Sequence, residues 1–424
     1  MKPRSRIDWE SSGMHRQSIN QKSLSALLRR SDYVGVASGL KAAHGAYLTN
    51  SALVVARDGL PATSLKTWPL YGKPHFAPAN IAIDLLIRNL ASNLQVLLKK
   101  RLQGRHSIVS NLRQLISESV PYRIYRLDVR SFYESFSTDD LCEAITGNPD
   151  LAPATRRLCA QLLTNQKSNG HEGLPRGLAI SAIISEAQMS SFDDRIASNA
   201  EVFFYARFVD DIIILTSGEE NASNFLSFAS SKLPPGLEFS EDETKKQIVE
   251  FKHPAKKGPA QTIGFDYLGY SFTAHSTTPA KSDRREIALT IAPKKVARIK
   301  KRIIRTLLDF ANNKDEALAL DRVKLLTSNF SIYNVGSGRF NTTGIYFSYP
   351  HIDFPSQELI DLDRFLRHAV LSKNGKVFAK IGAALTSRLR NKILKHSFSK
   401  GHEQKTFCHF SGNRLKLLQE CWKY

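Results

Sequence analysis

The chain has 424 residues with 60 Lys and Arg against 39 Asp and Glu, which gives a formal net charge of +21. So large a positive excess on a folded chain indicates a polyanionic partner, and nucleic acid is favoured over an anionic membrane surface. The sequence has no apolar run long enough to span a membrane, no signal-peptide core and only four cysteines, none in a Cys-x-x-Cys pair. These features argue against a membrane protein, a disulfide scaffold and a zinc finger, and they favour the cytoplasm.

Helical periodicity dominates the start of the chain. Apolar spacing predicts helices at about 21–30, 80–103 and 107–118, and residues 122–129 alternate as in a half-buried strand. The rest of 1–75 shows no pattern to which we assign a role.

A capped helix is expected next. Ser137 lies three residues before Asp140, so we assign Asp139 and Asp140 to a helix N-terminus rather than to a metal ion. A loop with Gly and Pro at 173–177 then opens a helix that runs to about Ile196.

The segment 203–217 is the most informative part of the chain. Two apolar, strand-like runs flank the adjacent carboxylates of Asp210 and Asp211, which predicts a β-hairpin with both acids at its turn. Burying two like charges side by side is unfavourable unless a cation or another partner compensates them. The hairpin therefore favours a divalent-metal site at a sheet edge, although Asp-Asp also occurs in ordinary turns.

The later elements complete an α+β order rather than a doubly wound one. We expect a helix near 219–232, a short strand at 237–239 and a strand-turn-strand at 262–273. Beyond Pro293 the pattern becomes mostly helical and strongly basic.

Asp128, at the end of the strand near 122–129, supplies a third carboxylate. Strand ends can be neighbours in an antiparallel sheet, so Asp128 is expected beside Asp210 and Asp211. Three clustered carboxylates need cations, and two Mg²⁺ ions held by aspartates is the arrangement used for in-line phosphoryl transfer. One ion would activate a primer 3′-hydroxyl and the other would neutralise a triphosphate. Asp128 and Asp210 would bridge both ions, with the Val129 carbonyl as a further ligand and Asp211 in support.

Five ordered segments between residues 122 and 273 resemble motifs of bacterial reverse transcriptases. They correspond to the first two palm motifs, the Tyr-x-Asp-Asp box, the lysine of the following motif and the primer-grip hairpin. In chain order the segments are Asp128-Val-Arg-Ser-Phe-Tyr133-Glu-Ser-Phe, Gly173-Leu-Pro-Arg176-Gly177-Leu-Ala-Ile-Ser181, Phe208-Val-Asp210-Asp211, Lys245 or Lys246, and Phe265-Asp-Tyr267-Leu268-Gly269-Tyr270.

This resemblance implies a right-hand polymerase of the α+β class, with fingers, an antiparallel-sheet palm that has an RRM-like core, and a mostly helical thumb. Residues 76–121 would form the fingers with a contribution from 150–180, residues 122–275 the palm, and residues 276–424 the thumb and a basic C-terminal region. The implied activity is RNA-directed DNA synthesis from dNTPs, with two Mg²⁺ ions, or Mn²⁺ in their place, an RNA template and a DNA product.

Three residues of these motifs concern the incoming nucleotide. Tyr133 stands five residues after Asp128, where an aromatic ring would clash with a 2′-hydroxyl, whereas RNA polymerases typically place an Asp there. An ordinary packed tyrosine is the alternative. Gly177 would allow the backbone to approach the nucleotide, and Arg176 replaces the Gln of many reverse transcriptases with a fixed cation. Phe208 replaces the Tyr of the box, which removes a hydroxyl near the primer terminus.

Basic segments are expected to contact template and primer. Among Arg101, Arg105 and Arg113 in the fingers region, Arg105 is favoured, and solvated helix-face charges are the alternative. A helix near 294–307 has an apolar stripe and a cationic stripe, and seven basic residues lie within 294–305, enough to neutralise several phosphates. Its cationic stripe consists of Lys294, Arg298, Lys301 and Arg305. The aromatic rings of Tyr333, Tyr346 and Tyr349 offer stacking surfaces, with ordinary packing as the default.

The amino-acid sequences of the first two motifs resemble those of defence-associated and abortive-infection reverse transcriptases in particular. That resemblance implies antiphage activity with a structured noncoding RNA as template, and a second defence protein or another copy of the chain as a candidate partner. Template-independent or protein-primed DNA synthesis is the enzymatic alternative. A non-catalytic RNA-binding scaffold is the alternative of another class. A membrane-surface protein is disfavoured because the sequence has no amphipathic anchor rich in bulky apolar residues.

Overall fold

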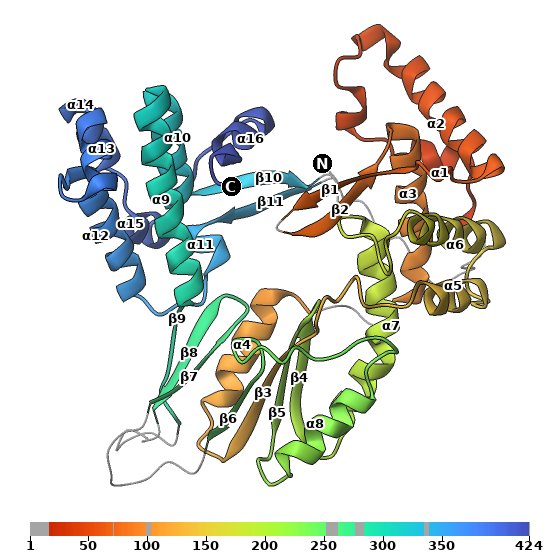
Figure 1. The fold of residues 1–424 in the computed structure, drawn as a ribbon, viewed down its shortest axis with the longest axis horizontal. Coiled ribbons are helices and arrows are strands. Elements are labelled where there is room, and N and C mark those ends of the chain that lie inside the picture. Colours follow the sequence, from red (N-terminus) through yellow and green to blue (C-terminus); the bar gives the residue numbers. More distant parts are fainter. Residues whose placement is uncertain are drawn as a thin grey trace, which may run out of the picture. The chain divides into compact units, whose positions relative to one another are not determined.

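The structure, a computed structural model, describes residues 17–70, 72–98, 103–251, 262–275, 284–334 and 339–423. The chain divides into two compact units, each made of two stretches of sequence. Unit 1 comprises Met1–Gln103 and Ile124–Ile248, and unit 2 comprises Gly104–Arg123 and Val249–Tyr424. Helices and antiparallel strands occur in both units (Figure 1), which confirms the α+β class.

Unit 1 contains most of the helices that were predicted before residue 240, and two longer helices, α2 and α6, that were not. Its helices are α1 (Gln21–Ser25), α2 (Lys41–Asp58), α3 (Ile81–Asn93), α5 (Thr138–Thr146), α6 (Pro153–Ser168), α7 (Ala179–Ala197) and α8 (Ala222–Ser231), with short 3-10 turns at Arg30–Tyr33, Ser38–Leu40 and Leu94–Leu97. A hairpin of β1 (Leu65–Leu70) and β2 (Lys73–Pro78) precedes α3.

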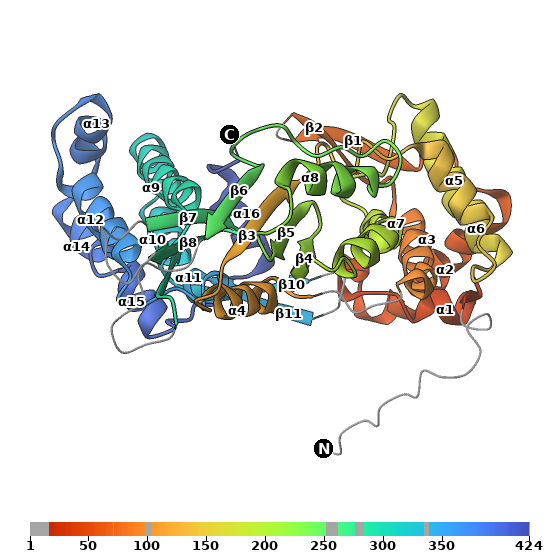
Figure 2. The same ribbon diagram turned by 90° about the horizontal axis from the view of Figure 1, so that it is seen from below.

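A four-stranded sheet holds the predicted acidic hairpin. Its strand order is β4 (Val202–Phe208), β5 (Asp211–Thr216), β3 (Tyr122–Asp128), β6 (Gln247–Phe251), and β3 and β6 cross the division between the units. Helix α8 lies beside this sheet (Figure 2), where the ring of Phe225 contacts that of Tyr125 with centroids 4.8 Å apart. The central strand β5 is therefore covered, and Ile212, Ile213 and Ile214 are completely buried.

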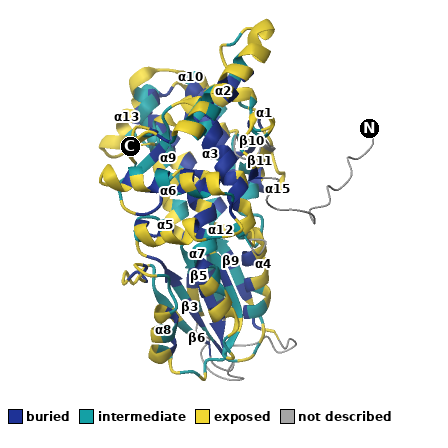
Figure 3. Ribbon diagram, turned by 90° about the vertical axis from the view of Figure 1, so that its right-hand side faces the viewer, coloured by how far each residue is buried: buried dark blue, intermediate teal, exposed yellow. Residues whose placement is uncertain are grey.

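One hydrophobic core joins the sheet of unit 1 to its helices. Leu127 and Ile212 of the sheet belong to the same buried cluster as Leu90 of α3 and Phe192 of α7. Figure 3 shows α3 buried along much of its length. This packing fixes the ends of β3 and the turn between β4 and β5, because both follow directly from buried strands.

The predicted cap of α5 is confirmed. The Ser137 side chain accepts a hydrogen bond from the Asp140 amide, and Asp139 and Asp140 occupy the first helical turn. Carboxylates at this end of a helix are stabilised by the backbone dipoles, so these two acids have a structural role.

Unit 2 combines a three-stranded antiparallel sheet, a second hairpin and a set of helices. The sheet order is β7 (Thr262–Tyr267), β8 (Tyr270–His275), β9 (Ile287–Ile291), and the hairpin pairs β10 (Asn329–Asn334) with β11 (Arg339–Gly344). The helices are α4 (Arg105–Ile116), α9 (Pro293–Asn313), α10 (Glu316–Thr327), α11 (Ile345–Ser348), α12 (Gln357–Leu371), α13 (Lys376–Ala384), α14 (Ser387–Ile393), α15 (Phe398–Glu403) and α16 (Gly412–Glu420).

Helix α9 has the two faces predicted from its sequence. Lys294, Arg298 and Lys301 are exposed, whereas Ile303 and Leu307 are buried. Proline at the first helical position suits the start of the helix, since its missing N–H would have no partner there.

Three expectations require correction. The α-helix predicted at 80–103 ends at Asn93 and is followed by a 3-10 turn. The strand predicted at 237–239 is reduced to one isolated bridge between Phe239 and Val129, because the preceding backbone forms a turn in which Leu237 donates to the Pro234 carbonyl. The helix predicted at 21–30 ends at Ser25. Among the residues that the structure describes, no helix has the length and apolar character needed to cross a membrane.

Candidate active site

The turn between β4 and β5 is held in an unusual backbone conformation. Phe208 pairs with Asp211, which leaves Val209 and Asp210 as the two turn residues. Val209 has φ of 62°, a region that a β-branched side chain rarely adopts. Two hydrogen bonds hold the turn: the Arg207 guanidinium donates to the Val209 carbonyl at 3.0 Å, and the Val129 amide donates to the Asp210 carbonyl at 3.1 Å. Such strain persists only where the surroundings enforce it, as they do here.

Arg207 anchors this hairpin to α7. Its guanidinium is almost completely buried and donates to Glu186 at 2.7 Å and to Asp193 at 2.7 Å. The Tyr205 hydroxyl donates to Asp193 at 2.5 Å. A buried cation with two carboxylate partners has its charge compensated, so the network gives the acidic turn a rigid base.

Asp128 lies at the end of β3, the strand next to β5, and is 8% exposed. Its Oδ1 accepts a hydrogen bond from the Lys245 ammonium at 2.7 Å. Lys246 points elsewhere and pairs with Glu241 at 2.9 Å. Of the two lysines predicted for this region, Lys245 is therefore the one beside the aspartates.

The three aspartates interact electrostatically. Burial, together with the negative charges of Asp210 and Asp128, raises the pKa of Asp211 to about 6. Burial also raises the pKa of Asp210, with Asp128 adding to the rise while Lys245 and Arg176 oppose it. Burial and neighbouring carboxylates thus both oppose ionisation of Asp210 and Asp211, a situation that a bound cation would relieve.

The oxygen donors present suit a hard divalent cation, since carboxylates and backbone carbonyls are the ligands that Mg²⁺ and Mn²⁺ prefer. Within the described part of the chain, however, no three His, Cys, Asp or Glu side chains are arranged so that they could hold a metal ion together. Lys245 supplies the positive charge beside Asp128. The donor chemistry of Asp128, Asp210 and Asp211 thus fits a divalent ion, which would compete with Lys245 for Asp128.

Tyr133 is half-buried beside a group of charged side chains. The Arg176 guanidinium lies 5.1 Å from the centre of its ring and donates to both carboxylate oxygens of Glu134, at 2.9 and 3.0 Å. Lys73 on β2 lies 3.5 Å from Glu134 and 3.4 Å from the Ser131 hydroxyl. Burial raises the pKa of Tyr133, and the charge of Asp210 adds to the rise.

The loop at 173–177 needs glycine because it contacts the chain's own backbone. Gly173 has φ of +81°, and a Cβ there would overlap the Tyr133 carbonyl oxygen. Gly177 has φ of +106°, and a Cβ would lie 2.9 Å from the Phe76 carbonyl oxygen. The Phe76 amide also donates to the Arg176 carbonyl at 2.9 Å. These contacts account for both glycines without a nucleotide, and the predicted nucleotide contact of Gly177 stays a prediction.

The predicted primer-grip residues form a tight turn in unit 2. Leu268 and Gly269 between β7 and β8 both have positive φ, 47° and 82°, as in the two-residue hairpin turns that favour glycine. Arg105 donates to the Leu268 carbonyl at 2.9 Å and to the Ser348 carbonyl at 2.7 Å. Tyr267 is buried at 1% exposure. Arg105 thus has a structural role in unit 2, and its contact with a template stays a prediction.

The structure divides the predicted site residues between the two units. Arg113 pairs with Asp353 in unit 2, and Arg101 lies outside the described residues. Phe208 is 38% exposed beside the acidic turn. Unit 1 holds Asp128, Val129, Tyr133, Arg176, Gly177, Phe208, Asp210, Asp211, Lys245 and Lys246, and unit 2 holds Arg105, Tyr267, Leu268, Gly269, Lys294, Arg298, Lys301 and Arg305.

Lys73 and Arg207 were not identified from the sequence as residues of this site. Lys73 lies in the part of the chain to which no role was assigned, and its partner Glu134 is distant in sequence. Arg207 could have been found, since an arginine inside an otherwise apolar strand implies a buried acidic partner.

Comparisons with known proteins match part of the chain to a protein family. Residues 90–272, less than half of the chain, match the family described as reverse transcriptase (RNA-dependent DNA polymerase). No curated protein matches the chain in sequence. Among solved structures, an apo telomerase from Candida tropicalis truncated from its C-terminal domain matches with 14% identity and a TM-score of 0.33. The match covers 54% of this chain and 58% of the telomerase chain, so it spans little more than half of either.

Proposed function

We propose that this chain is an RNA-directed DNA polymerase that extends a primer 3′-hydroxyl by phosphoryl transfer at Asp128, Asp210 and Asp211. The match of residues 90–272 to the reverse transcriptase family supports the activity. The observation that carries this proposal is the position of the three aspartates. Asp128 ends β3 beside β5, and the Val129 amide next to it donates to the Asp210 carbonyl at 3.1 Å. A carboxylate cluster with raised pKa values at a sheet edge is costly for folding and is useful for holding divalent cations.

Two divalent ions, Mg²⁺ or Mn²⁺, would lower the pKa of the primer hydroxyl and neutralise the triphosphate. Asp128 and Asp210 would hold both ions, with the Val129 carbonyl and Asp211 as further oxygen donors. The hydrogen bond from the Val129 amide to the Asp210 carbonyl keeps the two ligand segments adjacent. Lys245 would leave Asp128 as the ions enter and would then lie near the developing negative charge.

The charged group around Tyr133 suits an incoming deoxynucleotide. Arg176 and Lys73 both contact Glu134, so two cations are held close together before any triphosphate arrives. A triphosphate can replace the carboxylate as their partner, because phosphate oxygens bind Arg and Lys strongly. The Tyr133 ring, fixed by Arg176, would lie under the sugar and exclude a 2′-hydroxyl.

The polymerase is further proposed to act in bacterial antiphage defence with a structured noncoding RNA as template. The support is the resemblance of its first two motifs to those of defence-associated reverse transcriptases, together with its strongly basic composition. A second defence protein or another copy of the chain is the proposed protein partner, and the cytoplasm the proposed location.

The enzymatic proposal is tested with the purified chain, a primed RNA template, dNTPs and Mg²⁺. Asp210→Asn is expected to lower DNA synthesis by at least about a hundredfold, since such electrostatic groups contribute about that much or more. Asp139→Asn is the matched control, because that acid lies in the first turn of α5. Equal activity of the two variants would contradict the assignment of the catalytic aspartates.

Omission of the RNA separates templated synthesis from its alternative. Synthesis that continues without RNA at an unchanged rate would show template-independent polymerisation. Full phage protection by Asp210→Asn would favour the non-catalytic scaffold instead.

A further inference from the structure

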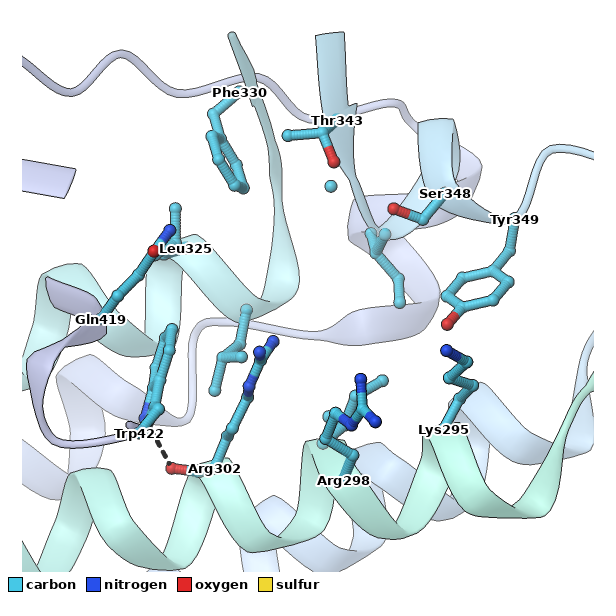
Figure 4. Close-up of a pocket in the computed structure, with 14 residues that line it drawn as sticks. Lys295, Arg298, Arg302, Leu325, Phe330, Thr343, Ser348, Tyr349, Gln419 and Trp422 are labelled. Atoms are coloured by element: carbon cyan, nitrogen blue, oxygen red, sulfur yellow. Dashed lines mark hydrogen bonds between the residues drawn. The ribbon is translucent and has the colours of Figure 1, made fainter. Parts of the chain in front are cut away.

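A pocket in unit 2 is not used by the proposed chemistry. It has a volume of about 270 Å³ and lies between α9, the β10–β11 hairpin, α11 and the C-terminal segment that includes α16 (Figure 4). Pockets for drug-sized ligands measure roughly 300–1,000 Å³. This one therefore suits a ligand about as large as a single nucleotide.

One wall of the pocket is cationic. Lys295, Arg298 and Arg302 follow one another at three- and four-residue spacing, so their side chains leave α9 on the same side. Figure 4 shows Arg298 and Arg302 directed from α9 into the pocket. None of the lining residues is acidic. A wall with three cationic side chains favours an anionic ligand.

The pocket flank of α9 differs from the stripe that was predicted to contact a duplex. Lys294, Lys301 and Arg305 do not line the pocket, whereas Arg298 lies at its edge and belongs to both surfaces. Arg298 is exposed and forms no ion pair within the described residues. The same helix therefore presents two cationic surfaces side by side.

Three aromatic rings line the pocket, and those of Trp422 and Tyr349 lie beside its cations. The Trp422 indole N–H donates to the Arg302 carbonyl at 3.2 Å and to the Thr306 hydroxyl at 3.1 Å, which fixes the ring in place. The Arg302 guanidinium lies 5.1 Å from the centre of that ring. Across the pocket, the Tyr349 ring points towards Lys295 (Figure 4). Rings held in this way are ready to stack with a base, because little side-chain freedom is lost on binding.

The positive charges of the pocket also act on the hydroxyl of Tyr349. Burial raises the pKa of Tyr349, and the charges of Arg105, Arg298 and Arg302 oppose that rise. The hydroxyls of Thr343 and Ser348 and the amide of Gln419 also line the pocket, so hydrogen-bonding groups are available for a sugar and a base edge.

We propose that this pocket binds one nucleotide of a single-stranded nucleic acid, with its phosphate on Arg298 and Arg302 and its base against Tyr349 or Trp422. Cations beside fixed aromatic rings are the combination by which proteins hold unpaired bases. The carboxylates of an acidic peptide would pair with the cations but would not stack on the aromatic rings. The proposal goes beyond DNA synthesis, because binding here requires no metal ion and no incoming triphosphate.

The test measures binding of a short oligouridylate to the full chain by fluorescence anisotropy, in an Asp210→Asn background that separates binding from synthesis. The pocket variant is Arg298→Gln combined with Arg302→Gln. The matched control is Lys300→Gln combined with Lys380→Gln on α13, which removes the same charge from positions outside the pocket. Lys300 lies over the Phe365 ring at 5.4 Å, on another side of α9.

The pocket variant is expected to bind about tenfold more weakly, and the control to keep its affinity within about twofold. The salt dependence of binding should fall by about 1.4 in slope for the pocket variant, since each contact with a single strand contributes about 0.7. Equal weakening by both variants would show a general charge effect and overturn the proposal.

Photocrosslinking of the unaltered chain provides a second test that does not depend on folding of a variant. An oligouridylate with one 5-iodouridine is expected to crosslink to Tyr349 or Trp422, and mass spectrometry identifies the residue. Crosslinks confined to other segments would overturn the proposal. Polyglutamate that binds through Arg298 and Arg302 while oligouridylate does not would overturn it in favour of an acidic peptide.

Discussion

The Lys245 ammonium lies 2.7 Å from Oδ1 of Asp128, so the carboxylate at the end of β3 already has a cationic partner. The hydrogen bond to Asp128 is the main reason why the pKa of Lys245 is raised, and Asp210 adds to that rise. A divalent ion that binds Asp128 must compete with this ammonium for the same oxygen.

Lys245→Met is therefore expected to tighten binding of a divalent ion several-fold, because the competing charge is removed. Mn²⁺ binding followed by electron paramagnetic resonance measures this affinity directly and independently of DNA synthesis. Lys246→Met is the matched control, since Lys246 pairs with Glu241 instead. Weaker or unchanged Mn²⁺ binding by Lys245→Met would show that the lysine is not a competitor.

The pKa of Asp211 predicts how stability depends on pH. Its folded-state pKa is about 6 against an ordinary value of 3.8, so the folded state holds a proton more firmly than the unfolded chain. The protonated form stabilises the fold fully below about pH 4, and this contribution is lost as the pH rises through 6.

Asp211→Asn should remove this pH dependence. Above pH 6 and with EDTA, the variant is expected to be more stable than the unaltered chain by about 1–3 kcal/mol, and the difference should vanish near pH 4. Thermal unfolding at the two pH values measures it. A variant that is less stable at pH 7 would show that Asp211 gains more from its contacts than it loses by burial.

Gly173 and Gly170 offer a matched pair for the loop beside Tyr133. Both have positive φ, +81° and +84°, so replacement by alanine costs similar backbone strain at each. A Cβ at Gly170 meets nothing within 4 Å, whereas one at Gly173 would overlap the Tyr133 carbonyl oxygen.

Gly173→Ala is therefore expected to destabilise unit 1 by about 1–3 kcal/mol more than Gly170→Ala, the usual range for overpacking. It should also lower DNA synthesis more, because the backbone of Tyr133 must shift. Melting temperatures and primer extension test both effects. Equal behaviour of the two variants would mean that the loop yields without disturbing Tyr133.

The sequence predicted the elements whose side chains follow one clear period. Strand β3, helix α7, the β4–β5 hairpin and the two faces of α9 were located because apolar residues recur where the core is. Helix α2 was missed because its buried residues include the small Gly45 and Ala52 and the polar Thr49, which give little apolar signal. Strand β1 was missed because it is mostly exposed.

The residues of the candidate site were likewise predicted only where their position in a strand or turn determines their place. The acidic turn and Asp128 were predicted from their positions at strand ends. The choice between Lys245 and Lys246 depends on which side chain reaches the end of β3, and sequence spacing does not determine that direction. The group of Lys73, Arg176 and Glu134 joins segments that are far apart in sequence, so only the folded chain brings it together.

Tyr133 gives the most direct prediction about substrate choice. Tyr133→Val should increase incorporation of ribonucleotides relative to deoxynucleotides, because the ring that would exclude a 2′-hydroxyl is removed. An increase of about tenfold or more is expected, corresponding to the relief of a clash of about 1.4 kcal/mol or more. Single-nucleotide primer extension with matched rNTP and dNTP measures the ratio. Tyr133→Phe is the control, since it keeps the ring and removes only the hydroxyl. If Tyr133→Val leaves the ratio unchanged, the tyrosine is a packing residue and another group selects the sugar.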